Sequence, residues 1–103
     1  MVGDYGKPRP AVVVQSDALV EFGFSSVVIC PVSSDVSGGS KVRVGVVPCP
    51  DNGLQVPSEV MVEKLVGLPR QKLRRVIGHL DAATMRRIDR ALFIVLGLGR
   101  ARS

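Results

Sequence analysis

The stretch DAATMRRIDRALFIVLGLG (81–99) contains the clearest helix signal in the chain. Asp81 stands directly before it and offers a side-chain oxygen to cap the first turn. Apolar residues then follow at spacings of three, four and three, which places them on one face of a helix: Met85, Ile88, Leu92 and Val95. Gly97 and Gly99 end the pattern. We therefore predict an amphipathic helix that buries one face and exposes arginines on the other.

The residues before this helix favour strands. Five stretches rich in β-branched residues are predicted to be extended: 10–15, 26–32, 41–46, 58–66 and 75–80. Strands first and one long helix last are typical of an α+β domain, mainly β. We predict a curved sheet or small barrel covered by one long C-terminal helix.

The connecting segments are rich in glycine, proline and polar residues. Residues 1–10 and 33–40 are predicted to be loops, and Asn52-Gly53 favours a tight turn with positive φ. Single helical turns are expected within 17–24 and 69–73. Pro31 lies inside a predicted strand, so it requires a bulge or a departure from the hydrogen-bond ladder.

A chain of 103 residues has room for one core, so we predict a single domain spanning 1–103. Aromatic residues make up 4% of it, which argues against a protein that stacks nucleic-acid bases on many rings. The apolar run at 92–98 is far shorter than the roughly 20 residues of a membrane span. Because no signal peptide is recognisable, we expect a cytoplasmic protein with no membrane contact.

No metal and no cofactor are expected. One His and two separated Cys do not make a zinc-binding pattern, and no glycine-rich phosphate-binding motif is present. Cys30 and Cys49 are expected to stay reduced. The lone His79 is more typical of a structural or surface histidine than of a catalytic base.

Charge is divided unevenly along the chain. Residues 64–103 hold ten Lys or Arg and two Asp, a net charge of +8, whereas residues 1–63 carry a net −3. A basic half attracts a polyanion or an acidic protein, although a solvated cationic surface is an equally good interpretation of the charge alone.

Two short segments combine groups suited to a phosphate. The loop GDYGKPRP (3–10) holds a carboxylate, a phenol and two cations, and Pro10 keeps Arg9 extended. Ser33 and Ser34 follow a buried strand, whose end can position their hydroxyls. Arginine with hydroxyl donors is a phosphate-binding set, while a surface turn and a strand-ending serine pair are the plainer interpretation.

Four blocks in this order resemble the MazF/PemK family of toxin endoribonucleases from toxin–antitoxin pairs: GKPRPAVVVQSD (6–17), VVICPVSS (27–34), DNGLQVPSEVMVEKL (51–65) and IGHLDAATMRRIDRALFIVLGL (77–98). The resemblance implies a strongly curved antiparallel sheet in a small SH3-like barrel with a long C-terminal helix. It also implies a homodimer that cleaves single-stranded RNA sequence-selectively and without a metal. The 2′-hydroxyl would attack the adjacent phosphorus and leave a 2′,3′-cyclic phosphate and a 5′-hydroxyl. It also implies a cognate antitoxin, whose acidic disordered tail suits the basic helix face.

The resemblance also assigns roles to single residues. The family's catalytic arginine falls on Arg9, and its hydroxyl residue, usually Thr, falls on Ser33. Asp4 stands where some members carry a carboxylate, and we take it as the alternative base, because a guanidinium is a poor proton acceptor. Arg9 would stabilise the phosphorane and Ser33 would donate to a non-bridging oxygen. The residues expected to bind RNA are Lys7, Tyr5, Ser34 and Lys64.

Two departures from the family pattern bear on these expectations. Members open with a strand before the first loop, whereas this chain starts almost at the loop, so that strand is expected to be missing. A common Gln-x-Arg is replaced by Lys64-Leu65-Val66. Two other functions stay open: a gyrase-poisoning toxin of the CcdB type, and an inactive remnant that still binds antitoxin.

Overall fold

The computed structural model describes residues 1–5, 9–36, 38 and 40–99. Seven strands make up most of it: β1 (Val2–Tyr5), β2 (Arg9–Val13), β3 (Ser26–Ser33), β4 (Arg43–Val46), β5 (Ser58–Met61), β6 (Val66–Pro69) and β7 (Leu73–Gly78). The α-helices are α1 (Asp17–Glu21) and α2 (Ala82–Val95), and two single 3-10 turns are η1 (Val62–Lys64) and η2 (Arg70–Lys72). The predicted helical turns and the C-terminal helix are thus confirmed.

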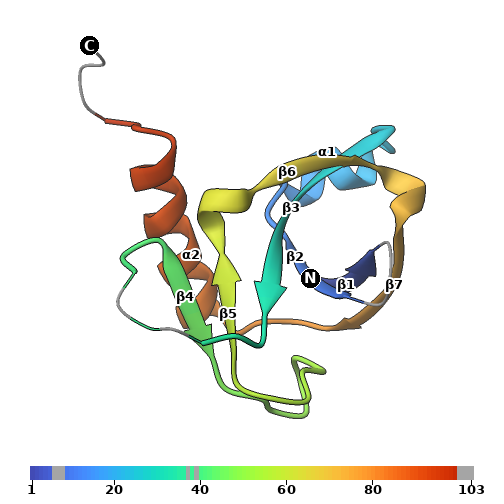
Figure 1. Cartoon of the computed structure of the whole chain (residues 1–103). Coiled ribbons are helices and arrows are strands. Elements are labelled where there is room, and N and C mark those ends of the chain that lie inside the picture. Colours follow the sequence, from blue (N-terminus) through green and yellow to red (C-terminus); the bar gives the residue numbers. More distant parts are fainter. Residues whose placement is uncertain (6–8, 37, 39, 100–103) are drawn as a thin grey trace.

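The strands form one antiparallel sheet in the order β4-β5-β3-β2-β1-β7, and β6 also pairs with β3. The sheet curls strongly, with β6 and β7 sweeping round one side of it and α2 lying on the other (Figure 1). Within the described residues the end strands β4 and β7 do not pair. The predicted α+β, mainly β fold is confirmed as a curved, open sheet.

Pro31 marks the point at which β3 changes partners. Its earlier half pairs with β6 as far as Ile29, and its end pairs with β5 from Val32. Pro31 lies between these two ladders and has no N–H to donate. Pro31 stays opposite Ala11 in the ladder with β2, so the predicted departure holds only on the other edge of β3, where the strand passes from β6 to β5.

The expectation that the N-terminal strand is missing is wrong. Residues 2–5 are not a loop but form β1, which pairs with β2 on one side and with β7 on the other. Val2 is fully buried in the core. A Cβ on Gly3 would lie 2.9 Å from the end of the Leu73 side chain and 3.0 Å from the Arg75 carbonyl oxygen, so both neighbours would have to shift. Only four residues are needed for this strand, too few for a period-two pattern to be recognised.

The predicted strand over 58–66 is two strands separated by η1. β5 ends at Met61, and β6 begins at Val66 after a turn that contains the buried Val62. The alternation of apolar residues continues through the turn, so the pattern alone does not reveal the break. The turn thus carries the chain from β5, which pairs with the end of β3, to β6, which pairs with the beginning of β3.

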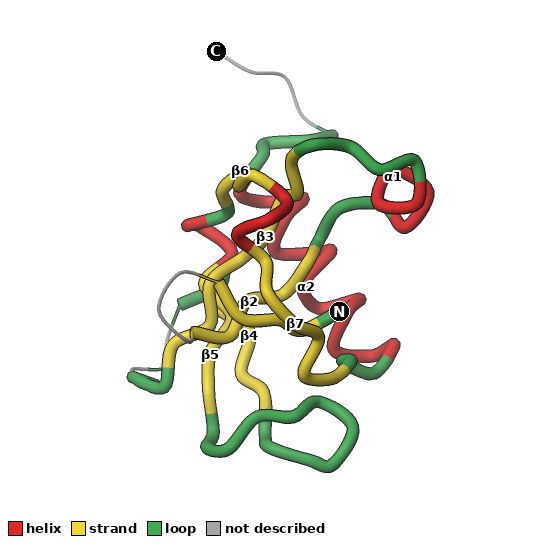
Figure 2. The backbone as a smooth tube through the Cα atoms, turned by 90° about the vertical axis from the view of Figure 1, so that its right-hand side faces the viewer, coloured by secondary structure: helices red, strands yellow, loops and turns green. Residues whose placement is uncertain are grey.

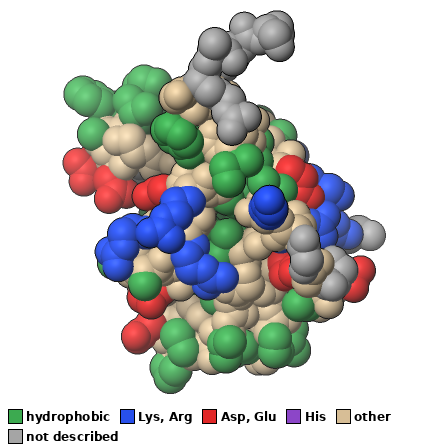
Figure 3. All heavy atoms as spheres, turned by 90° about the vertical axis from the view of Figure 1, so that its left-hand side faces the viewer, with side chains coloured by type: hydrophobic (Ala, Val, Ile, Leu, Met, Phe, Trp, Pro, Cys, Tyr) green, Lys and Arg blue, Asp and Glu red, His purple; other side chains and the backbone are tan. Residues whose placement is uncertain are grey.

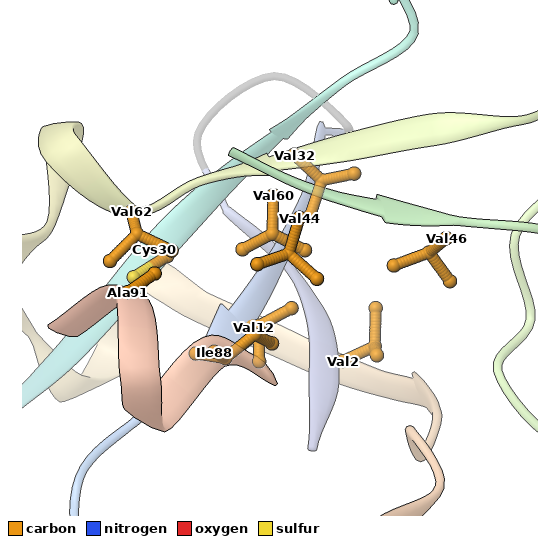
Figure 4. Close-up of a cluster of buried hydrophobic side chains, with 10 residues drawn as sticks. All are labelled: Val2, Val12, Cys30, Val32, Val44, Val46, Val60, Val62, Ile88 and Ala91. Carbon is orange, nitrogen blue, oxygen red and sulfur yellow. The ribbon is translucent and has the colours of Figure 1, made fainter. Parts of the chain in front are cut away.

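The core consists of two clusters on opposite faces of the β2–β3 pair. Figure 4 shows the larger one, in which valines of β3, β4 and β5 face Ile88 and Ala91 of α2. The smaller one contains Ala11, Val13, Val27 and Ile29, with Leu68 and Leu73 packed against it. Alternate residues of one strand pair therefore serve two cores.

Helix α2 begins and ends as its sequence predicts. The Asp81 side chain accepts a hydrogen bond from the Thr84 N–H at 3.1 Å, and Gly97 and Gly99 after the helix have φ of 65° and 77°. The helix packs on β4 and η1. Among the described residues, no helix has the length and apolar character to cross a membrane.

Candidate functional site

A hollow of about 540 Å³ lies where the ends of β2 and β3 meet β7 and the loop between β4 and β5. Arg9 and Arg75 bring two guanidinium groups to its lining, and Ser33 and Ser34 bring hydroxyls. Residues 53–56 form another wall. Guanidinium and hydroxyl donors gathered in one concavity are suited to a phosphate group.

The sheet register aligns two polar residues of the hollow with polar residues of the strands on either side. In the β2–β3 pair Ala11 stands opposite Pro31, and continuing this antiparallel register by two residues places Arg9 opposite Ser33. On its other side Ser33 pairs with Glu59 of β5. Side chains opposite each other on neighbouring strands have Cβ atoms about 5 Å apart. We call this series the site row; across four strands it runs Tyr5, Arg9, Ser33, Glu59.

A rigid turn holds one wall of the hollow. The buried Asn52 accepts N–H groups of Cys49 and Leu54 at 3.2 and 3.0 Å and donates to the Val47 carbonyl at 3.0 Å. Gly53 follows with a φ of 69°, so close to the backbone of Ile77 in β7 that only glycine fits. The predicted Asn-Gly turn is confirmed. The loop carrying it projects from the lower end of the sheet in Figure 2.

Ser33 links the hollow to the loop that follows β3. Its Oγ accepts the backbone N–H of Asp35 at 3.0 Å, which fixes the first turn of that loop. Ser33 is half-buried, whereas Ser34 and Arg9 are exposed. Arg9, Ser33 and Ser34 all line the hollow, and Arg9 and Ser34 are open to solvent.

Glu59 is a buried carboxylate at the end of the site row. Its side chain is 6% exposed, and its Oε2 accepts the Gly38 N–H at 3.2 Å. Its Oε1 has no hydrogen-bond partner among the described residues and lies 4.0 Å from Nη1 of Arg43. Arg43 instead donates to Glu63 at 2.7 and 3.0 Å, and this hydrogen bonding lowers the pKa of Glu63.

The structure brings some of the predicted site residues together. Arg9, Ser33 and Ser34 line one hollow. Asp4 and Tyr5 lie on β1, where they pair with Pro10 and Arg9. The remaining two are elsewhere: Lys7 lies outside the described residues, and Lys64 is exposed in η1, away from the lining of the hollow.

Two residues of this region were missed in the sequence. Arg75 is one of ten cations in the basic half, and only the sheet topology shows that β7 brings it to the hollow. Glu59 belongs to a stretch predicted to be a strand, but its burial depends on β3 and β4 flanking it on both sides. The segment Pro57-Ser58-Glu59 holds no pattern that predicts the burial of Glu59.

A second hollow, of about 730 Å³, lies between β4, the loop after it and the start of α2. It combines His79 and Arg87 with the carboxylates of Asp51 and Asp81, so it favours an anion less than the first hollow does. No three His, Cys, Asp or Glu residues among those described lie together as a metal site would require.

The outer side of α2 is basic. Arg86, Arg87 and Arg90 are exposed there, and Nη1 of Arg87 donates to the Gly45 carbonyl at 3.1 Å. Figure 3 shows Lys and Arg side chains gathered on the face of the molecule that contains α2 and β4. This face is a candidate surface for an acidic partner.

Comparison with known proteins yields one family. Residues 1–96 match the model of the PemK-like, MazF-like toxin of type II toxin–antitoxin systems. The chain is 33% identical over 93 residues to a protein named probable endoribonuclease MazF from Mycolicibacterium smegmatis; the match covers 90% of this chain and 84% of that one.

Solved structures agree with this match. The Mycobacterium tuberculosis toxin MazF-mt6 superposes with a TM-score of 0.83 at 25% identity, covering 96% of this chain and 98% of that one. A mycobacterial endoribonuclease in complex with its cognate antitoxin superposes with a TM-score of 0.80 at 21% identity, covering 97% of this chain and 94% of that one. At 21% identity, the similarity to this second structure shows only that the two proteins share a fold.

Proposed function

The chain belongs to the PemK-like, MazF-like family of type II toxins and is an endoribonuclease of that family, and we propose that it cleaves single-stranded RNA in the hollow formed by β2, β3 and β7. The observation that carries this assignment is the position of Arg9 beside Ser33 in one concavity of about 540 Å³. The gyrase-binding alternative needs neither residue. The interpretation as an inactive remnant rested on a missing strand, which is present as β1.

The proposed chemistry is an attack of the RNA 2′-hydroxyl on the adjacent phosphorus. The bond from phosphorus to the 5′-oxygen breaks, leaving a 2′,3′-cyclic phosphate and a 5′-hydroxyl. Arg9 stabilises the charge of the phosphorane, because a guanidinium offers several N–H donors and keeps its charge at neutral pH. Ser33 supplies a hydroxyl at the same phosphate, and Asp4 is the base that the sequence offers. No residue in this scheme needs a metal or an organic cofactor.

The strand of RNA would extend beyond the hollow along polar residues near it. Ser34 follows Ser33 in the lining, and Tyr5 pairs with Arg9 in the sheet. Lys7 and Lys64 would contact the RNA backbone further out. Arg75 adds a second guanidinium to the hollow and joins these residues as a phosphate contact. Such contacts position the RNA rather than select its sequence.

The basic face of α2 would bind the acidic tail of a cognate antitoxin. It exposes Arg86 and Arg90, and a relative with this fold was solved in complex with its antitoxin. A disordered acidic segment that folds on this face would be held by charge complementarity. Two copies of the chain would form a homodimer, and the toxin would act in the cytoplasm, where its RNA substrate is.

The test uses purified protein, a long single-stranded RNA and excess EDTA. We expect discrete fragments with 5′-hydroxyl ends. Arg9→Ala should slow cleavage by at least roughly a hundredfold, the usual effect of losing one transition-state hydrogen-bond donor. Arg90→Ala removes the same charge from α2 and serves as the matched control, with a rate within about twofold of the native protein. Intact RNA with a folded native protein would contradict the proposal.

A further inference from the structure

The site row contains a buried carboxylate to which the proposed chemistry gives no task. Glu59 lies next to Ser33 across the β3–β5 ladder, and its side chain is 94% buried, since 6% is exposed. A buried carboxylate oxygen without a donor costs more than an apolar side chain in the same place. Oε1 of Glu59 is such an oxygen among the described residues. A donor that reaches this oxygen would explain why a carboxylate stands there.

Arg43 is not that donor in the structure. Its Nη1 lies 4.0 Å from Glu59 Oε1, beyond hydrogen-bond distance, while Nε and Nη2 of the same guanidinium bind Glu63. Gly38 donates to the other oxygen, Oε2. Gly45, the remaining strand neighbour of Glu59, has no side chain to offer. The Ser33 hydroxyl does not donate to Oε1 in the structure either, but Ser33 is the hydroxyl-bearing neighbour of Glu59 across the β3–β5 ladder.

The hydrogen bonds that Ser33 already makes decide whether its hydroxyl acts as a donor or as an acceptor toward an RNA in the hollow. A serine hydroxyl has one proton and two lone pairs. The Asp35 N–H occupies one lone pair at 3.0 Å. If the proton is directed to Glu59, only the second lone pair is left for the hollow. Ser33 would then present an acceptor to the RNA, not a donor.

Building on the proposed function, we infer that Glu59, in place of Asp4, takes up the proton of the attacking 2′-hydroxyl, acting through Ser33 as a positioning residue. As the 2′-oxygen forms its bond to phosphorus, its proton passes to Ser33 Oγ, and the Ser33 proton passes to Glu59 Oε1. The 5′-oxygen leaves with the bonding pair and takes a proton from water. Glu59 returns its proton to solvent before the next cycle, so the site regains its starting charge.

The relay accounts for a task that Arg9 performs poorly. A guanidinium that stays charged at neutral pH cannot accept a proton, whereas a carboxylate can. Glu59 is screened from water, and Gly38 and the β3–β5 ladder hold it in place. Ser33 is the cross-strand neighbour of this acceptor and lines the hollow that Arg9 also lines.

A double-mutant cycle tests the inference with single-stranded RNA in EDTA. Glu59→Gln keeps the size of the side chain and an oxygen for the Gly38 N–H, but it removes the proton acceptor. We expect kcat to fall roughly a hundredfold with KM within about twofold, the usual contribution of a general base. In the Ser33→Ala background, Glu59→Gln should have no further effect, because both changes break one relay.

Two further variants separate the relay from a structural role. Glu21→Gln makes the same chemical change at an exposed position of α1 and should leave kcat within about twofold of native. Glu59→Asp keeps a carboxylate and should recover at least about tenfold over Glu59→Gln. Melting curves are recorded for all variants, and the cleavage assays are run well below the lowest melting temperature. A change in rate then does not come from unfolding.

The outcomes distinguish the inference from the function on which it rests. If native protein leaves RNA intact, or if Ser33→Ala cuts at the native rate, the proposed site and the relay are both overturned. If Ser33→Ala is slow but Glu59→Gln loses the same factor in both backgrounds, only the relay is overturned. Equal rates for Glu59→Asp and Glu59→Gln would overturn it as well.

Discussion

The inner and outer faces of the three strands β3, β5 and β4 differ in composition although they share the same backbone. On the inner face Val32, Val60 and Val44 form one cross-strand row, and all three are buried against the α2 side. In the next cross-strand row, one residue away on each strand, the outer face contains Ser33, Glu59 and Gly45. Stability and chemistry are thus separated by a single step of the strand period.

The separation has an energetic basis. The inner row contributes through apolar burial, which grows with the area removed from water. The outer row buries a carboxylate, one of whose oxygens has no hydrogen-bond partner among the residues that the structure describes, an arrangement that costs stability. If the comparison is right, changes on the inner face lower stability with little effect on activity per folded molecule, and changes on the outer face do the reverse.

The largest expected effect is that of Ile88→Ala, which opens a cavity opposite the inner row. Ile88 is fully buried, so its loss should lower the free energy of unfolding by about 2–5 kcal/mol. Phe93→Ala on the same helix is the control, because Phe93 is 53% exposed and its loss should cost much less. Urea unfolding measures both, and RNA cleavage per folded molecule should stay near native. A large activity loss in folded Ile88→Ala would contradict the separation.

The inner face is also where sequence patterns were most informative. The three-four spacing of α2, the Asp81 cap and the order of strands before helix each rest on local, repeated features, and all were confirmed. β1 was not recognised because four residues with one buried valine carry too little pattern. The break at Val62 was missed because apolar alternation continues through η1.

The outer face was predicted only in part. Arg9, Ser33 and Ser34 were identified through the family resemblance, and the structure brings them to one hollow. Arg75 and Glu59 depend on which strands become neighbours, a property that follows from the curl of the whole sheet. Contacts between residues far apart in sequence leave no local pattern, so these two positions could be found only in the folded chain.

The two cysteines offer a second way to compare a buried and an exposed position. Cys30 lies in the core, where burial raises the pKa of its thiol to about 11, whereas Cys49 is exposed. At neutral pH we expect a thiol-alkylating reagent to modify Cys49 alone in the native protein and both residues after unfolding, because the thiolate is the reactive form. Mass spectrometry of the digested protein identifies the site. Rapid native labelling of Cys30 would show that the inner face opens readily.

The same shift predicts how stability changes in alkali. In the unfolded chain the Cys30 thiol ionises near its usual pKa of 9.0, while in the folded protein it keeps its proton to about 11. Between these values the unfolded state has already lost a proton that the folded state retains, so stability falls as pH rises from 9 to 11. Cys30→Ala should flatten this fall relative to native protein, as measured by urea unfolding at several pH values.

The smallest expected effect concerns the end of α2 rather than its buried face. Hydrogen bonds from Thr84 lower the pKa of Asp81, whose side chain caps the helix. Asp81→Ala should lower the melting temperature by a few degrees, and Asp81→Ser, which restores a capping oxygen, should recover most of it. Because the charged form is the one stabilised, the gap between native and Asp81→Ala should close as pH falls through the lowered pKa. RNA cleavage per folded molecule should not change, because Asp81 caps the helix that supports the inner row and does not line the hollow that contains Arg9 and Ser33. A loss of activity without a loss of stability would show that the two faces are coupled through α2.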